Sequence, residues 1–202
     1  PLQGGEKGYA LQQMGFGFPQ SFFWSGKETE QSRKMADLVA RYFTKGVTEK
    51  AYSGSKIKPY RYIPVGRSLE HARQAVLPLP MMEEVVHGAG VLALAHCSCR
   101  MIYKMKGGTC NHPTEVCLKV NDMARYLIDR GLGREVTVEE AMEVVRRSED
   151  HGLVHFVDNA SGEIQHNCNC CGCACWNVGN IRRRRVPRDV LMDTYFIREM
   201  KA

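Results

Sequence analysis

Several features that would narrow the function of this chain at once are missing from its sequence. No apolar run approaches the ~18 residues that a membrane-spanning helix needs, and the longest, residues 91–95, has the length of a strand. The N-terminal residues contain no apolar core of a signal peptide, so we expect a cytoplasmic protein without a membrane span. Paired carboxylates, a Ser-His-Asp set and a phosphate-binding glycine loop are also missing, which leaves the corresponding kinds of catalysis without support.

Cysteine is missing from the first part of the chain and crowded into the second. Residues 1–96 contain none, and all nine cysteines lie within residues 97–175. The odd total and the adjacent pair Cys170–Cys171 argue against a disulfide framework. A metal site in a reducing compartment is the simpler interpretation.

The rest of the composition is that of a globular protein. The 202 residues are enough for one domain with an extension, and 44% of them are hydrophobic and 25% charged. The net charge of +6 is locally concentrated in Arg182–Arg185. Such a run is typical of a solvated loop, of a nucleic-acid contact, or of a segment that compensates a negatively charged cofactor.

Periodicity and capping signals predict the main elements of secondary structure. The spacing of Ser25 and Glu28 indicates a capping box for the first helix, and Thr137 and Glu140 indicate another. Residues 91–95 and 153–157 are expected to be strands. The predicted helices are residues 27–44, a short helix from Ser68 to before Pro78, 80–87, 113–130 and 138–150.

We expect two parts in the chain. Residues 1–66 are predicted to form an N-terminal arm, rich in glycine and aromatic residues, followed by a helix and a basic, extended crossing. An exposed aromatic arm of this kind favours a stable complex with a partner, so we interpret this part as an interaction extension. Residues 67–202 then form the domain that carries the cysteines.

The spacing of the cysteines indicates iron–sulfur clusters. A cubane cluster is held by four thiolates, so two clusters need eight of the nine cysteines. Cys117 is expected in the first turns of the helix over residues 113–130, where free amides suit an anionic cluster. The first predicted group of ligands is Cys97, Cys99, Cys110 and Cys117, and the second is Cys168, Cys170, Cys171, Cys173 and Cys175.

The second group offers one thiolate more than a cluster needs. Adjacent side chains point in opposite directions along an extended chain. We therefore expect one of Cys170 and Cys171 to be spare or to join the other cluster, and a swap of ligands between the groups is a further alternative. Gly172 and Ala174 are small, so backbone amides can approach the sulfurs there. Arg100, Arg182 and Arg183 are predicted to bind at the cofactors by supplying positive charge.

Other interpretations of the cysteines fit less well. Structural zinc prefers paired C-x₂₋₄-C spacings, which the Cys-x-Cys and Cys-Cys patterns match poorly. Residues 170–173 form a C-x-x-C that could act as a redox dithiol, although further cysteines lie beside it. The C-x-x-C-H of covalent haem and the C-x₂-C-x₂-C-x₃-C-P run of bacterial ferredoxins are not found.

Together these motifs resemble a group of proteins. The stretches 95–100, 139–141, 152–155 and 168–173, with Cys110 and Cys117, are similar to cysteine-rich, ferredoxin-like 4Fe-4S proteins of anaerobic microbes. The resemblance covers about residues 60–185, and it implies clusters and electron transfer without naming a substrate. The additional ordinary ferredoxin segment that many such proteins carry does not occur in this sequence.

These arguments give one leading expectation and two alternatives. We expect an α+β protein, mostly helical with a few short strands and organised around two iron–sulfur cluster sites. It would be an electron-transfer protein or subunit with two [4Fe-4S] clusters in an anaerobic oxidoreductase complex, and its partners would be a larger redox enzyme or other electron-transfer subunits. One alternative is an enzyme with reductive chemistry at an open cluster site, and the other is a redox-sensing regulator that binds nucleic acid through Arg182–Arg185.

Overall fold

The fold was analysed in a computed structural model of the 202-residue chain. The structure describes residues 18–44, 49–50, 53–54, 58, 60–62, 82–158, 164–183 and 185–193. The helices among these residues are α1 (Phe18–Ser21), α2 (Glu30–Thr44), α5 (Met82–His87), α6 (Ser98–Met105), α7 (Asn121–Asp129), α8 (Val138–Asp150), α9 (Val178–Arg182) and α10 (Arg188–Leu191). The strands are β1 (Tyr60–Tyr62), β2 (Leu92–His96), β3 (Glu115–Val120), β4 (Arg134–Glu135), β5 (Val154–Asp158), β6 (His166–Cys170) and β7 (Met192–Asp193).

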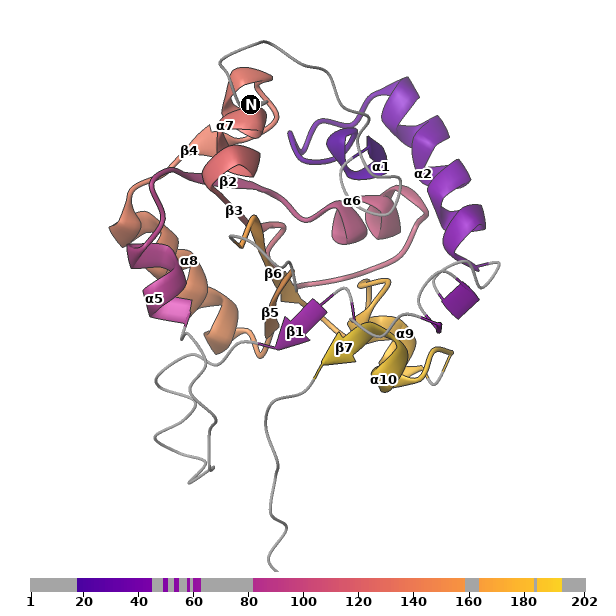
Figure 1. The fold of residues 1–202 in the computed structure, drawn as a ribbon. Coiled ribbons are helices and arrows are strands. Elements are labelled where there is room, and N and C mark those ends of the chain that lie inside the picture. The colour runs from indigo at the N-terminus through magenta and orange to yellow at the C-terminus, as the bar shows by residue number, and fades with distance from the viewer. Residues whose placement is uncertain are drawn as a thin grey trace, which may run out of the picture.

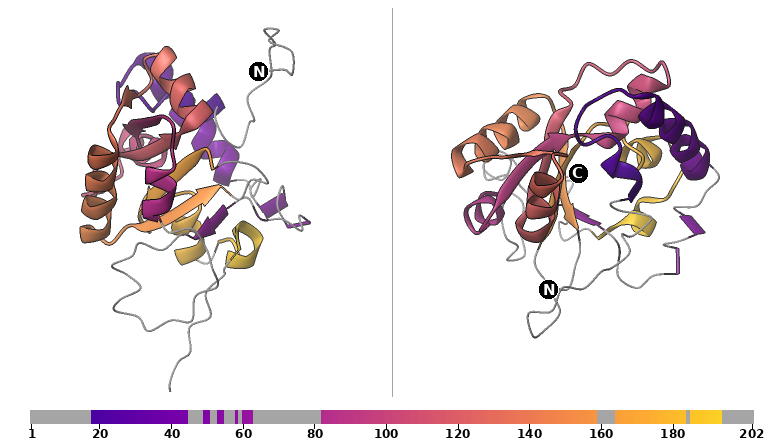
Figure 2. Two further views of the ribbon diagram at one scale, coloured as in Figure 1. Left: turned by 60° about the vertical axis from the view of Figure 1, so that its left-hand side comes forward. Right: turned by 90° about the horizontal axis from the view of Figure 1, so that it is seen from above.

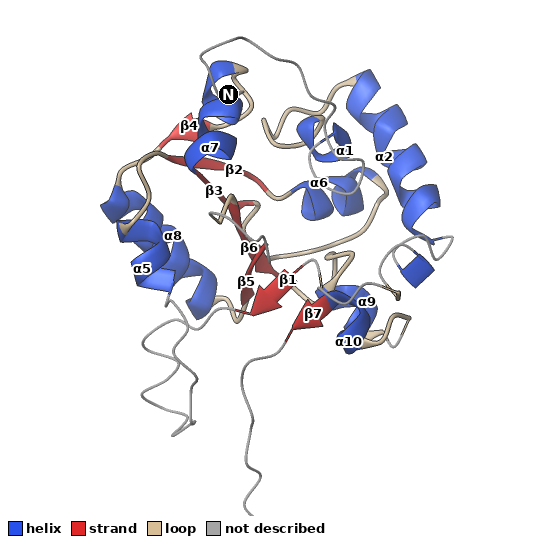
Figure 3. Ribbon diagram, viewed as in Figure 1, coloured by secondary structure: helices blue, strands red, loops and turns tan. Residues whose placement is uncertain are grey.

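One sheet runs through the middle of the described part of the molecule. Its strands follow the order β4-β2-β3-β6-β5-β1-β7. Neighbouring strands are antiparallel, except that β1 and β7 are parallel. Figure 3 shows the central strands between two sets of helices. The two central strands, β3 and β6, bring the two cysteine-bearing segments of the sequence side by side.

The two faces of the sheet are covered differently. Leu92 and Leu94 on β2 pack with the apolar residues of α5 and α8, whereas Ala93 and Ala95 pack with Trp24 and residues of α7. Because side chains alternate along a strand, these two sets mark opposite faces. Helices α5 and α8 lie on one side, and α1, α2 and α6 lie on the other (Figures 1 and 2). The cysteines of β3 and β6 face this second side.

The central sheet overturns the predicted fold class. A mostly helical protein with a few short strands was expected, and the main error lies in residues 113–130, which were predicted to form one helix. The structure has strand β3 in the first half and helix α7 in the second. Asn121 separates them with a φ of +52°, a left-handed conformation that Asn tolerates better than most residues. Cys117 is consequently a strand residue and not part of a helical first turn.

Most of the other predicted elements are confirmed with shifted ends. The predicted helix at 80–87 is α5, and the strands expected at 91–95 and 153–157 are β2 and β5. Thr137 and Glu140 form the expected capping box of α8. Gly152 follows the end of that helix with a φ of +64°, a conformation that favours glycine.

The first long helix begins later than expected. The predicted capping box at Ser25 is wrong, because α2 starts at Glu30. Thr29 makes the capping contacts instead: its Oγ1 accepts a hydrogen bond from the Ser32 amide at 3.1 Å, and its own amide donates to Ser32 Oγ at 2.8 Å. The helix predicted from Ser68 to before Pro78 lies outside the described residues.

Parts of the predicted extension contact the remainder of the fold. Strand β1 pairs with β5, and α2 packs on α6. Phe23 and Trp24, two aromatic residues of the predicted exposed arm, are 0% and 2% exposed, while Phe18 is 43% exposed. The described part of the arm is therefore attached to the protein itself. The division at residue 66 stays a prediction, since residues 63–81 are not among those described.

Candidate metal centre

The nine cysteines are all free thiols, and six of them line one cavity. These six come from β3, from β6 with the loop that follows it, and from the start of α6. Each thiol lies close enough to shift the pKa of the next, in the order Cys97, Cys99, Cys175, Cys170, Cys168 and Cys117, and Cys97 in turn raises the pKa of Cys117. We call these six residues the thiol ring.

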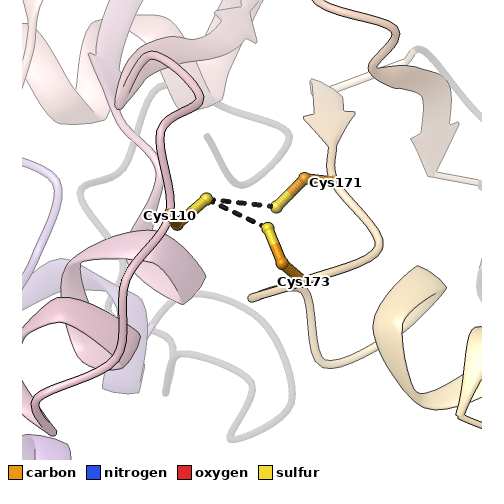
Figure 4. A group of neighbouring side chains, drawn as sticks. All are labelled: Cys110, Cys171 and Cys173. Carbon is orange, nitrogen blue, oxygen red and sulfur yellow. Dashed lines mark hydrogen bonds between the residues drawn. The ribbon is translucent and has the colours of Figure 1, made fainter.

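The remaining three cysteines form a second, compact group. Cys110 Sγ lies 3.1 Å from Cys173 Sγ and 3.8 Å from Cys171 Sγ. All three sulfur atoms lie within 4.8 Å of one another, which is the geometry of a metal site. Figure 4 shows Cys110 on one segment facing Cys171 and Cys173 on the loop after β6. We call these residues the thiol triad, and they could hold a metal ion.

The contacts between sulfurs do not follow the grouping predicted from the sequence. Cys110 was expected to join Cys97, Cys99 and Cys117, but its sulfur contacts are with the triad partners Cys171 and Cys173. The reason is the sheet: antiparallel pairing of Leu118 with Asn167 brings Cys117 beside Cys168. Hydrogen bonding between β3 and β6, and not proximity in sequence, therefore determines that Cys117 meets Cys168.

The predicted divergence of Cys170 and Cys171 is confirmed. Cys170 is the last residue of β6 and interacts with Cys168 and Cys175 in the thiol ring. Cys171 is the first residue beyond the strand and faces Cys110 and Cys173 in the triad. The two thiol groups are therefore joined through consecutive residues, whose Cα atoms are about 3.8 Å apart.

A cavity of about 180 Å³ adjoins the thiol ring, and all six ring cysteines line it. Aromatic side chains form much of the rest of its wall: Trp24, Tyr42, Phe43, Tyr60, Phe156 and Trp176. Phe43 and Trp176 are stacked, with ring centroids 5.4 Å apart. Trp176, expected from the sequence to be a core or shielding residue, lies at this wall. Such a wall restricts access of water to the sulfurs.

Arg100 lies between the two thiol groups. Its side chain is buried at 2% exposure, and its Nη1 and Nη2 donate to the carbonyl oxygens of Pro113 at 2.6 Å and Asn169 at 2.8 Å. Burial alone would lower the pKa of Arg100, but the neighbouring thiolates of Cys97, Cys171 and Cys170 outweigh that effect and raise it. The positive charge of the guanidinium therefore favours thiolates in both the thiol ring and the thiol triad, as expected for a cationic residue beside the sulfurs.

A second buried cation, Lys119, was not singled out from the sequence. It is 4% exposed, and its Nζ lies 5.0 Å from the centroid of the Trp24 ring. It also acts electrostatically on Cys117, favouring the thiolate, although the contact with Cys168 and burial raise the pKa of Cys117 overall. The signal in the sequence was the spacing: Cys117 and Lys119 lie two apart on a strand and so share a face.

Asn169 is the other residue that the sequence analysis missed. It lies on β6 between Cys168 and Cys170, and its side chain points away from theirs. Its Nδ2 donates to the Val116 carbonyl at 2.7 Å, and its Oδ1 lies 2.7 Å from His155 Nδ1. Together with the bond from Arg100, these contacts fix the strand that presents both cysteines.

Two of the predicted cationic residues, Arg182 at the end of α9 and Arg183 directly after it, contact the loop of the triad. Arg183 Nη1 donates to the Cys173 carbonyl at 2.8 Å, and Arg183 Nη2 donates to Asn180 Oδ1 at 3.1 Å. Arg182 covers Gly172 so closely that a Cβ there would lie 2.6 Å from Arg182 Cδ. Glycine at 172 thus permits the close approach of a cationic side chain. Arg184 is outside the described residues.

Backbone amides also point at the sulfurs, as the small residues of this loop predicted. The Ala174 amide donates to Cys171 Sγ at 3.5 Å, and the Asn177 amide donates to Cys175 Sγ at 3.4 Å. Burial works against ionisation of Cys171, but the Ala174 amide, Cys173 and Arg100 lower its pKa to about 7. Burial and the hydrogen bonds to Cys110 and Cys171 raise the pKa of Cys173 to about 12.

The chemistry of this donor set fits a thiolate-bound metal or iron–sulfur centre. Soft thiolate ligands select zinc, copper(I) and iron–sulfur clusters. The buried Nε of Arg100 has no hydrogen-bond acceptor within the described residues, so it is available to a sulfur or to an anionic group held by the thiols.

Comparison of the chain with protein-family models, with curated proteins and with solved structures gives no match. Within the part of the chain that the structure describes, none of the helices combines the length and the apolar character needed to cross a membrane.

Proposed function

We propose that this chain is an electron-transfer protein or subunit that carries two [4Fe-4S] clusters within an anaerobic oxidoreductase complex. The observation that supports it most is the meeting of all nine cysteines in two adjoining thiol groups. Neither group is assembled from neighbours in sequence alone: each combines residues from 97–117 with residues from 168–175. The fold itself brings these thiols together.

The number and placement of the thiols favour clusters over zinc. A structural zinc ion uses four ligands, commonly from paired C-x₂₋₄-C turns. The thiol ring has six members, more than one zinc ion binds, and all of them line one cavity. A polynuclear iron–sulfur centre presents several metal ions to such a set, so that separate thiolates bind separate irons.

The surroundings of the thiols suit a centre that accepts and gives up electrons. Burial, amide-to-sulfur hydrogen bonds and nearby charge are the means by which a protein sets the potential of a cluster. The thiol ring adjoins an aromatic wall, and Cys175 Sγ accepts a hydrogen bond from the Asn177 amide. The cations Arg100 and Lys119 lie beside the ring thiols. When bound, a cluster supplies the one-electron chemistry, and these residues exclude water and compensate its negative charge.

The relation between the two groups supports transfer from one centre to the other. Cys170 belongs to the ring and Cys171 to the triad, and Arg100 acts on both. Two centres held by consecutive residues would be close neighbours. The ring is nearer the aromatic cavity, whereas Cys110 of the triad is flanked by the exposed residues Thr109 and Asn111. The triad is thus the side at which a redox partner would approach.

The partner is proposed to be a larger redox enzyme or another electron-transfer subunit. Arg182 and Arg183 are exposed and contact the triad loop, and Arg185, close by in the sequence, is exposed as well. Complementary charge accelerates and orients protein association, so we expect the partner to present an acidic surface here.

The proposal is tested by redox titration of the anaerobically purified chain. The expected result is two reversible one-electron transitions, each with the EPR spectrum of a reduced [4Fe-4S] cluster. The chain should then pass these electrons to an oxidised partner that copurifies with it, at a rate that falls as salt concentration rises. A protein that contains zinc and no sulfide, and that shows no reversible reduction, would contradict the proposal.

A further inference from the structure

The sulfur atoms of the thiol triad lie as close together as thiolates that share one metal ion. Cys110 Sγ is 3.1 Å from Cys173 Sγ and 3.8 Å from Cys171 Sγ (Figure 4). Two thiolates on one tetrahedral zinc ion, with bonds of about 2.3 Å, are about 3.8 Å apart. Among the described residues, no three sulfurs of the thiol ring lie within 4.8 Å of one another, whereas the three of the triad do. The triad thus has the spacing of a site for a single ion.

The surroundings of the triad suit the charge of such a complex. Three thiolates and one divalent cation carry a single negative charge in total. Arg100 is buried at 2% exposure, and its positive charge stabilises the Cys171 thiolate. Arg183 Nη1 donates to the Cys173 carbonyl at 2.8 Å, and the Ala174 amide donates to Cys171 Sγ at 3.5 Å. Contacts of this kind orient the ligands of a metal and compensate their charge.

The triad is also accessible to an ion from solvent. Cys110 and Cys173 are half-buried, whereas Cys171 is 3% exposed. Thr109 and Asn111, on either side of Cys110 in the sequence, are exposed. A metal site needs an entry path in addition to its ligands, and the two half-buried thiols provide it.

We propose that, before sulfide is supplied, the thiol triad binds one divalent transition-metal ion, such as Fe²⁺, Co²⁺ or Zn²⁺, through all three thiolates. Thiolates favour ions of this class over Mg²⁺ and Ca²⁺, which prefer oxygen ligands. The thiol protons are released to solvent when the ion binds. This inference goes beyond the proposed function and does not rest on it, because it requires neither sulfide nor a cluster.

The bound ion would join two segments that are far apart in the sequence. Cys110 precedes strand β3, and Cys171 and Cys173 follow strand β6, 61 and 63 residues after Cys110. An ion that binds the folded chain and not the unfolded chain stabilises the fold by mass action. We therefore expect the thermal midpoint of the sulfide-free chain to rise with the concentration of the ion.

The first arm of the experiment titrates the full chain, freed of iron and sulfide, with Co²⁺ in the absence of oxygen. Co²⁺ is the probe because sulfur-to-cobalt charge transfer reports thiolate ligands and the visible bands report tetrahedral geometry. The expected result is a charge-transfer band with its first break at about one Co²⁺ per chain, together with a higher thermal midpoint. The absence of this band at one equivalent would overturn the inference.

The second arm identifies the ligands of the first ion. Cys173→Ala should raise the dissociation constant of Co²⁺ more than about 100-fold, because loss of an outer contact alone costs about 10- to 100-fold. The matched ring variant, Cys168→Ala, should leave this constant unchanged. An affinity for the first ion that falls in Cys168→Ala and not in Cys173→Ala would overturn the assignment.

Alkylation of the wild-type chain checks the same assignment without a substitution. One equivalent of Zn²⁺ should protect Cys110, Cys171 and Cys173 from iodoacetamide, as read by mass spectrometry, and should not add protection to the ring cysteines. Added protection of the ring cysteines in place of the triad would overturn the assignment.

The outcomes separate this inference from the proposed function. A chain that binds its first ion at the triad, but builds no cluster when iron and sulfide are supplied, would overturn the proposed function and leave this inference intact. A chain that builds two clusters, but binds its first ion elsewhere, would overturn this inference and leave electron transfer intact.

Discussion

Arg100 donates a hydrogen bond of 2.8 Å from Nη2 to the backbone carbonyl of Asn169, 69 residues further along the chain. Arg100 lies in the first turns of α6, which begins directly after Cys97, and Asn169 lies on β6 between two ring cysteines. This bond therefore joins the two cysteine-bearing segments. It also holds a cation where members of both thiol groups approach one another.

We predict that Arg100→Leu lowers the reduction potentials of both centres. Removing the guanidinium leaves the negative charge of the clusters less compensated, which disfavours the reduced forms. The loss of two buried hydrogen bonds should also reduce the free energy of unfolding by about 3–5 kcal/mol, as for other broken buried charge contacts. The check is a redox titration followed by EPR, with the exposed Arg125→Leu as control. Unchanged potentials in a folded Arg100→Leu protein would contradict this role.

The grouping of the cysteines gives a second prediction. Cys110→Ala and Cys171→Ala should each weaken the same EPR signal, because both residues belong to the triad. Cys117→Ala and Cys168→Ala should instead weaken the other signal, because they are neighbours on paired strands. The spectra of the four reduced variants test this. A common signal affected by both Cys110→Ala and Cys117→Ala would contradict the division into ring and triad.

A third prediction concerns Lys119, the buried cation beside Cys117 and Trp24. Lys119→Met keeps most of the side-chain volume and removes the charge. We expect the potential of the ring centre to fall and that of the triad centre to change less, because Lys119 lines the ring cavity. Lys34→Met, at an exposed position on α2, is the matched control. Equal shifts at the two centres would show that Lys119 does not act locally.

The pH dependence of stability gives a fourth prediction. Burial lowers the pKa of His155 below 6.5, although its hydrogen bond to Asn169 partly opposes this. Below that pH the unfolded chain binds a proton that the folded chain does not, so stability is present above about pH 6.5 and is lost as pH falls.

His155→Gln should therefore show a smaller loss of thermal stability than the wild type between about pH 8 and about pH 5. The glutamine amide retains a donor toward Asn169, so a general disruption of the site is not expected. Thermal midpoints of both proteins, measured across this range without oxygen, provide the test. Parallel pH curves for the two proteins would show that His155 does not contribute to the pH dependence of stability.

The elements that could be predicted were those with local signals. The capping box of α8 and the glycine after it are contained within a few residues, and the structure has both. The opposite directions of Cys170 and Cys171 also follow from local geometry, since neighbouring side chains alternate along an extended chain.

The elements that were missed depend on contacts between distant segments. Residues 115–120 form a strand because β2 and β6 pair with them, and an apolar pattern that also fits a helix does not reveal those partners. The pairing of β3 with β6 also decides that Cys117 meets Cys168. The roles of Lys119 and Asn169 depend on it as well, because their environment exists only in the assembled sheet.

The most direct test of the central claim is the content of iron, acid-labile sulfide and zinc in the anaerobically purified chain, with Mössbauer spectra of the same sample. Two cubane centres predict about eight irons and eight sulfides per chain, with every iron in a four-iron cluster. Stoichiometric zinc without sulfide, or iron in mononuclear thiolate sites, would contradict the claim that these nine cysteines hold two iron–sulfur clusters.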